Sequence, residues 1–228
     1  MVSADSIIQS DTGAETAASS HVITLPSGTL EGSTVLVFLA GIAGVINPFD
    51  GFDRDQSASA GVCNVIVYRR KGVPAGEMSW TVTMLAPNFL GWVVYEVVGL
   101  DTLDATSNGT DGGAGDTTSM STGTTPSTTI DDIAAFAAHV IGNSTAPVAT
   151  DISGHTGGFA ERDEVLLADG ATEVRLSVSA CYPGAAGTLE CTASWTPGAA
   201  NQHSAAALVA YRAETTVSEK RGAIITSG

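Results

Sequence analysis

Histidine and cysteine are the residue types in this sequence best suited to hold a transition metal or to pair a nucleophile with a base. The four histidines are His21, His139, His155 and His203. None of them belongs to an HxxH or HExxH pair or stands beside a cysteine, which are spacings typical of zinc sites. The spacing therefore predicts no zinc site, and each histidine is interpreted as a structural residue of a strand or loop.

The cysteines Cys63, Cys181 and Cys191 form an odd and small set, which does not indicate a disulfide framework. Cys181 and Cys191 flank a turn at 183–187, so a hairpin could bring them together. Alternation along the two flanking segments places Cys181 on a polar face and Cys191 on an apolar face. The two thiols are then expected on opposite sides of the sheet, where a disulfide has the wrong geometry. We predict three free cysteines.

An acidic stretch at 49–55 contains the candidate metal ligands Asp50, Asp53 and Asp55. Carboxylate oxygens at this spacing could bind a calcium ion. The alternative interpretation, an ordinary acidic loop, is favoured. No serine stands in a GxSxG motif, and the spacing of Asp and Glu selects no carboxylate pair for glycoside hydrolysis. The sequence therefore predicts no catalytic residues and no cofactor, and a protein that is not an enzyme.

Exposed tryptophans could stack on sugar rings, because an aromatic ring combines a large apolar face with a defined geometry. Trp80, Trp92 and Trp195 all lie in segments with strand character. Core packing is the favoured interpretation for each of them. Binding of a host-surface glycan stays open as an alternative.

The composition excludes several classes of partner. The chain has 228 residues with 9 Lys and Arg against 24 Asp and Glu, a net charge of −15. Proteins that bind nucleic-acid phosphates or anionic membranes do so with basic side chains, so neither a nucleic acid nor a membrane is expected as a partner. The most apolar run, 35–46, is short against the ~20 residues of a membrane-spanning helix. Residues 1–20 do not resemble a secretory signal.

Short segments rich in Val, Ile, Thr and Tyr, separated by Gly, Pro, Asn and Asp, recur along the chain and are typical of strands. A run of alanines makes 131–139 the best helical candidate, but its flanks favour a strand. We predict an all-β fold, an antiparallel, jelly-roll-like sandwich of ten or eleven short strands. The expected strands are 21–24, 34–41, 61–70, 78–84, 91–98, 117–121, 132–142, 164–167, 172–182, 190–195 and 203–212.

The same pattern predicts a single domain over 20–213, because no charged linker or second hydrophobic period divides it. Residues 1–19 and 214–228 have little core content and are expected to be terminal arms. The Thr/Ser/Gly-rich stretch 105–129 is expected to be a long loop or flap with one weak strand.

The succession HVITLPSGTLEGSTVLVFLAG, FDGF, NVIVYRRKGVPAGEMSWTVTM and GWVVYEVVGLD, followed after a Thr/Ser/Gly stretch by DDIAAFAAHVIG, resembles β-sandwich virion proteins of tailed bacteriophages and prophages. The resemblance covers about residues 20–212 and implies a non-enzymatic structural protein, most often a minor tail protein, with head decoration as a variant. It implies other virion proteins as partners, a symmetric homo-oligomer, and a location in the virion after synthesis in the host cytoplasm. It carries over no functional residues. A carbohydrate-binding module for attachment to the host surface is the alternative from another class.

Overall fold

The computed structural model describes residues 3, 6–42, 46–61, 63–115, 117–143, 151–169, 172–196 and 202–214. These residues form twelve strands that build two five-stranded antiparallel sheets and one two-stranded sheet. The strands are β1 (Ile7–Thr24), β2 (Thr34–Ile42), β3 (Asp53–Ala60), β4 (Cys63–Lys71), β5 (Ser79–Val97), β6 (Leu100–Gly115), β7 (Ser119–Ser121), β8 (Ile133–Asn143), β9 (Ala160–Asp169), β10 (Thr172–Cys181), β11 (Thr192–Ser194) and β12 (Gln202–Ala213).

The two large sheets have the same topology. The first has the order β1-β5-β2-β4-β3, and the second has the order β6-β12-β8-β10-β9. If the five strands of each sheet are numbered along the chain, they lie side by side in the order first, fifth, second, fourth, third in both sheets. The chain completes one sheet at Val97 and begins the other at Leu100. The predicted all-β antiparallel sandwich is confirmed, and its two sheets come from the two halves of the sequence.

The strand register is also shared, which makes individual residues of the two halves equivalent. The residue of β2 that pairs with Tyr95 of β5 stands two positions before Phe38. In the same way, the residue of β8 that pairs with Tyr211 of β12 stands two positions before Phe136. The four rings meet where the sheets face each other. Phe136 lies 6.0 Å from both Phe38 and Tyr95, and 6.3 Å from Tyr211, between ring centroids. Such tilted aromatic contacts stabilise a core beyond the apolar area they bury.

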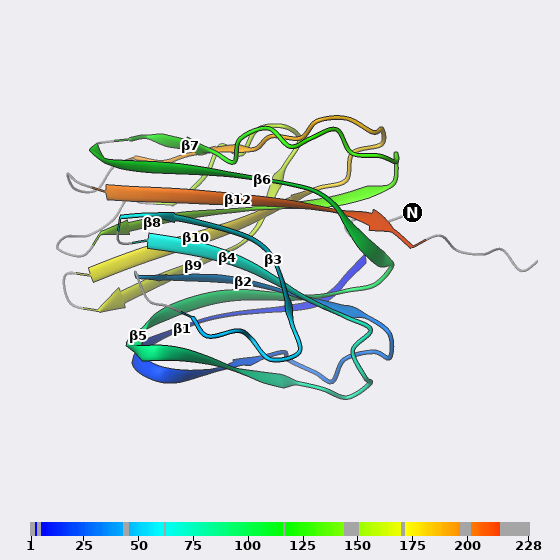
Figure 1. The fold of residues 1–228 in the computed structure, drawn as a ribbon, viewed down its shortest axis with the longest axis horizontal. Coiled ribbons are helices and arrows are strands. Elements are labelled where there is room, and N and C mark those ends of the chain that lie inside the picture. Colours follow the sequence, from blue (N-terminus) through cyan, green and yellow to red (C-terminus); the bar gives the residue numbers. More distant parts are fainter. Residues whose placement is uncertain are drawn as a thin grey trace, which may run out of the picture.

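The fold has four layers (Figure 1). The central apolar core lies between the two large sheets and draws on both halves of the chain. The outer face of the first sheet is covered by a ribbon in which 20–24 of β1 pair with 79–83 of β5. The outer face of the second sheet is covered by the two-stranded sheet of β7 and β11. The inner strands of each large sheet are therefore buried on both faces.

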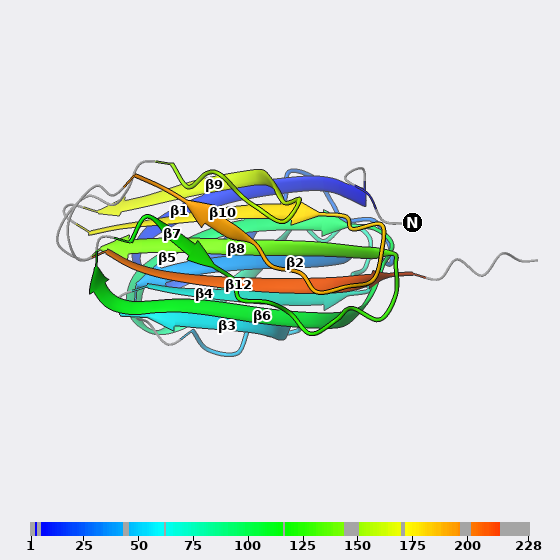
Figure 2. The same ribbon diagram turned by 90° about the horizontal axis from the view of Figure 1, so that it is seen from above.

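Burial on both faces explains the alanine-rich strand at the centre of the second sheet. Every residue of β8 is buried, so its sequence is apolar without the alternation of a half-exposed strand. Seen from above, the strands of the two sheets are nearly aligned, and β3 lies along the same edge as β6 (Figure 2). Aligned packing is usual for β-sandwiches. The strand interpretation of 132–142 is confirmed.

Polar edge strands are the elements that the sequence pattern missed. Residues 7–19 were predicted to be an arm, but they belong to β1, an edge strand whose main chain pairs with β5. Much of the predicted loop 105–129 belongs to β6, which pairs with β12, while β7 is its expected weak strand. The strand β3, with sequence DRDQSASA, was not predicted. Main-chain hydrogen bonds to an apolar neighbour hold these strands in place, so their side chains need little hydrophobicity.

The predicted segments 78–84 and 91–98 are two parts of one long strand, β5. The predicted C-terminal arm lies outside the described residues except for Glu214, whose amide donates to the carbonyl of Gly99 at 2.7 Å. In the part of the chain that the structure describes, no helix has the length and apolar character needed to cross a membrane.

Candidate functional site

The outer face of the second sheet, beneath β7 and β11, carries a buried group of potential metal ligands. His139 is on β8, Cys191 directly precedes β11, and His155 lies in the segment that leads to β9. One ligand atom from each of these three residues lies within 4.8 Å of the others. Three separate elements thus place two imidazoles and one thiol around one point.

Hydrogen bonding fixes the half-buried ring of His155. Its Nδ1 is 3.9 Å from the Sγ of Cys191, and its Nε2 is 3.2 Å from the Oγ of Ser177 on β10. The Ser177 hydroxyl also lies 3.4 Å from the Oε1 of Glu161. The two nitrogens of His155 therefore face different partners, a sulfur on one side and a hydroxyl on the other.

His139 is fully buried, and neither of its ring nitrogens has a hydrogen bond of normal geometry. Burial, and after it the neighbouring His155, lowers the pKa of His139 to about 3, which backbone groups of Cys191 and Met120 oppose only in part. Burial also lowers the pKa of His155 and raises the pKa of Cys191 to about 11. Near neutral pH, this cluster therefore holds neutral imidazoles and a protonated thiol.

The expected separation of Cys181 and Cys191 is wrong. Both lie in the same apolar cluster on the outer face of the second sheet, although all three cysteines are free as predicted. The chain after Cys181 does not return as a neighbouring strand of that sheet, as a hairpin would. It crosses to the covering layer, where Cys191 faces down onto the sheet and lies 3.8 Å from the Oγ of Ser179.

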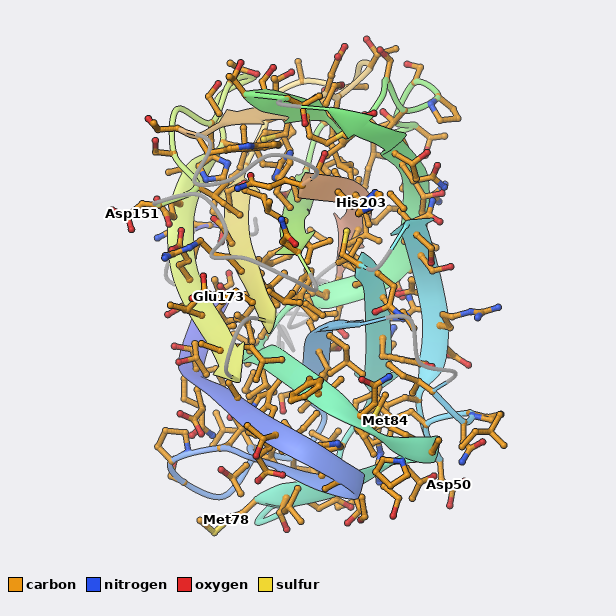
Figure 3. The ribbon with its side chains drawn as sticks, turned by 90° about the vertical axis from the view of Figure 1, so that its left-hand side faces the viewer. Asp50, Met78, Met84, Asp151, Glu173 and His203 are labelled. Atoms are coloured by element: carbon orange, nitrogen blue, oxygen red, sulfur yellow. The ribbon has the colours of Figure 1, made fainter. Side chains whose placement is uncertain are left out.

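The three aspartates proposed as calcium ligands do not converge. Asp55 points into the fold, where its carboxylate accepts a hydrogen bond from Tyr211 and lies 3.3 Å from the Nε of Arg69. Asp53 is exposed and lies 3.8 Å from Arg69. Asp50 stands in an exposed turn at the outer edge of the fold (Figure 3). The inward turn of Asp55 leaves no shared oxygen cage, and calcium binding by this trio stays an untested prediction.

A pocket of about 340 Å³ lies beside this acidic stretch. The rings of Phe49 and Phe52 are stacked at 4.1 Å, and Tyr68 meets Phe49 edge to face at 5.5 Å. The pocket is lined by Ile46, Pro48, Phe49, Phe52, Asp53, Arg54 and Tyr68. It thus combines an aromatic wall with one acidic and one basic side chain.

The three tryptophans and His21 are buried side chains. Trp80, Trp92 and Trp195 are buried, as the core interpretation expected. His21 is buried with both ring nitrogens 3.0 Å from oxygen atoms of Glu15 and Ala18, so it is a satisfied structural histidine.

The cluster of His139, His155 and Cys191 was not visible in the sequence, because its members are far apart and each lies in an otherwise ordinary segment. The signal that could have revealed the cluster is the presence of polar residues within two buried strands. His139 follows six apolar residues in β8, and Ser177 and Ser179 face the same side of the sheet from β10.

Comparisons with known proteins identify no relative of this chain: no family model matches it, and neither the curated proteins nor the solved structures gave a match.

Proposed function

We propose that this protein is a non-enzymatic structural component of a tailed-phage particle, in its tail or as a decoration of its head. The proposal rests on the sequence resemblance to β-sandwich virion proteins. The observation that supports it best is the four-layer packing, in which two sheets of one topology share a single apolar core. A block that is stiff in this way suits a component that is repeated in a symmetric assembly.

Exposed apolar side chains supply a candidate contact with neighbouring subunits. Leu85 on β5 is 70% exposed, more than any other large apolar residue among those described, and Leu166 on β9 is 43% exposed. Apolar side chains of this kind gain from burial when two proteins associate. We therefore assign the surface around Leu85 to contacts within the particle.

Electron microscopy of purified particles, with density or antibody labelling assigned to this chain, tests the proposal. We expect the chain at fixed, symmetry-related positions. Leu85→Glu should lower its incorporation into particles at least about tenfold, while Thr81→Glu, at an exposed position of the same strand, should incorporate normally. Absence of the chain from particles, or equal incorporation of both variants, would overturn the corresponding part of the proposal.

A second candidate function, binding of a host-surface glycan, is favoured by the pocket at Phe49, Phe52 and Tyr68. Apolar faces of sugar rings stack on aromatic side chains, and Asp53 and Arg54 could accept and donate hydrogen bonds to hydroxyl groups. A glycan array probed with the full chain tests this function. Binding that Phe52→Ala abolishes would support it, and an array without signal would remove it.

A further inference from the structure

We propose that His139, His155 and Cys191 form a binding site for one Zn²⁺ ion beneath the covering sheet of β7 and β11. The site is independent of the proposed structural function. It is built from two imidazole nitrogens and one thiolate sulfur, a donor set that zinc accepts in proteins.

The outer face of the first sheet, which is equivalent by topology, is built from different residues. By the shared register, Ser179 of β10 stands where Ile66 of β4 stands, and His139 of β8 stands where Gly41 of β2 stands. The outer face of the first sheet is filled by a continuous apolar cluster. At the place equivalent to His139 and Ser177, the first sheet has Gly41 and its partner, the buried Asn64. This topology therefore does not require a histidine at the position of His139.

The buried ring of His139 lacks hydrogen bonds of normal geometry. A buried polar group without a partner costs about 1–3 kcal/mol, and such groups are rare in native proteins. At an exposure of 0%, neither nitrogen of His139 has a hydrogen bond of normal geometry, and the polar groups nearest in effect are backbone groups of Cys191 and Met120. A bond to a metal ion would satisfy one of the two nitrogens.

The Sγ of Cys191 and the Nδ1 of His155 lie at nearly the distance that separates two ligands of one zinc ion. Zn–S and Zn–N bonds of about 2.3 and 2.0 Å at a tetrahedral angle place the sulfur and nitrogen about 3.5 Å apart. The Sγ of Cys191 and the Nδ1 of His155 are 3.9 Å apart. A shift of a few tenths of an ångström closes this pair around zinc.

The orientation of the His155 ring also suits a metal ligand. When Nδ1 binds the ion, the proton resides on Nε2, which donates to the Oγ of Ser177, and the Ser177 hydroxyl donates to Glu161. Metal-binding histidines commonly donate their second ring nitrogen in this way, which fixes the tautomer and the ring plane. Ser177 is thus a positioning residue, and Glu161 holds its hydroxyl.

Binding is a simple exchange of a proton for the ion. The thiol of Cys191 loses its proton to solvent, and the thiolate donates an electron pair to Zn²⁺. The described part of the cluster supplies three ligands, so the fourth tetrahedral position falls to a water molecule, which reaches the ion past the half-buried His155. The thiolate and imidazoles select against Ca²⁺ and Mg²⁺, which prefer oxygen ligands.

The test uses the full chain after treatment with a chelator, titrated with Co²⁺ as a spectroscopic substitute for zinc. We expect one equivalent to bind, with a thiolate-to-cobalt charge-transfer band that excess Zn²⁺ removes. Cys191→Ser should abolish the band, while Cys181→Ala, a buried cysteine of the same apolar cluster, should retain it. Ser177→Ala should retain the band but weaken Zn²⁺ binding about 10–100-fold.

A second variant keeps the proposal falsifiable if Cys191→Ser fails to fold. His155 is half-buried, so His155→Gln should fold, as circular dichroism would show, and should lose the rise in Tm that Zn²⁺ gives the original chain. No charge-transfer band in the original chain, a band that survives Cys191→Ser, or an equal Tm rise in His155→Gln would overturn the proposal.

Discussion

The hydroxyl of Tyr211 on β12 donates a hydrogen bond of 2.7 Å to the Oδ2 of Asp55, which lies 156 residues earlier on β3. This bond joins the two halves of the sandwich across the central core. Tyr211 is fully buried, and its ring also lies 5.5 Å from the guanidinium carbon of Arg69. The contact connects an inner strand of one sheet with the edge strand of the other.

Removing the hydroxyl should weaken the sandwich. We expect Tyr211→Phe to lower the free energy of unfolding by about 1–3 kcal/mol, because it leaves the buried carboxylate of Asp55 without its donor. Urea denaturation at constant pH measures the change. Tyr68→Phe is the matched control, since the Tyr68 hydroxyl has no hydrogen-bond partner among the described residues, and its effect should stay within about 0.5 kcal/mol. Equal effects of the two variants would contradict the importance of the Tyr211 bond.

Asp55 should give the stability of the protein a defined pH dependence. Burial raises the pKa of Asp55 above its ordinary value of 3.8, more than Tyr211 and Arg69 lower it. The folded state therefore holds this proton to higher pH than the unfolded state does. The contribution of Asp55 to stability is greatest below the unfolded pKa and is lost as the pH rises through the folded pKa.

Asp55→Asn removes this titration and serves as the reference. Denaturant unfolding from about pH 7 down to about pH 4 should show the original chain gaining stability relative to Asp55→Asn as the pH falls. A difference between the two proteins that is constant over this range, or that changes in the opposite direction, would show that burial does not dominate the pKa of Asp55.

The buried carboxylate of Glu96 should be a major anchor of the loop between β1 and β2. Its Oε1 accepts hydrogen bonds of 2.6 Å from the Leu30 amide and the Ser33 hydroxyl, and its Oε2 accepts one of 2.5 Å from Gln9. Glu96→Ala should cost about 2–4 kcal/mol of unfolding free energy, because three donors lose a charged acceptor. Glu31→Ala, which removes one exposed bond to the Ala75 amide, should cost less than about 1 kcal/mol in the same denaturation experiment.

Gly109 of β6 should be required for the layer that covers the proposed metal site. A Cβ at this position would overlap the carbonyl oxygen of Ser121 on β7. We expect Gly109→Ala to lower the unfolding free energy by about 1–3 kcal/mol and to speed the labelling of Cys191 by thiol reagents, because β7 must move away. A methyl group at Gly184 meets no atom within 4 Å, so Gly184→Ala should change neither quantity. Unchanged labelling in Gly109→Ala would contradict the tight contact.

By itself the sequence determined the fold class and most of the inner strands. Segments such as 34–41 and 132–142 are mostly apolar because both of their faces are buried, and this pattern is visible without a structure. The edge strands β1, β3 and β6 were missed because their stability comes from main-chain pairing with a neighbour, which leaves little trace in the side chains. The repeated TxPS at 24–27 and 124–127, before β2 and β8, is a short sequence trace of the plan that the two halves share, and it did not enter the prediction.

Only the tertiary structure decided which polar residues meet. The acidic stretch suggested that Asp50, Asp53 and Asp55 share one site, but an irregularity in the pairing of β3 with β4, at Asp55 itself, lets this side chain turn inward to Tyr211 and Arg69. His139, His155 and Cys191 come from three segments that meet because β7 and β11 fold over the second sheet. Strand identity is a local property of side-chain pattern, whereas the contents of a site depend on long-range pairing and layer packing, which local spacing does not record.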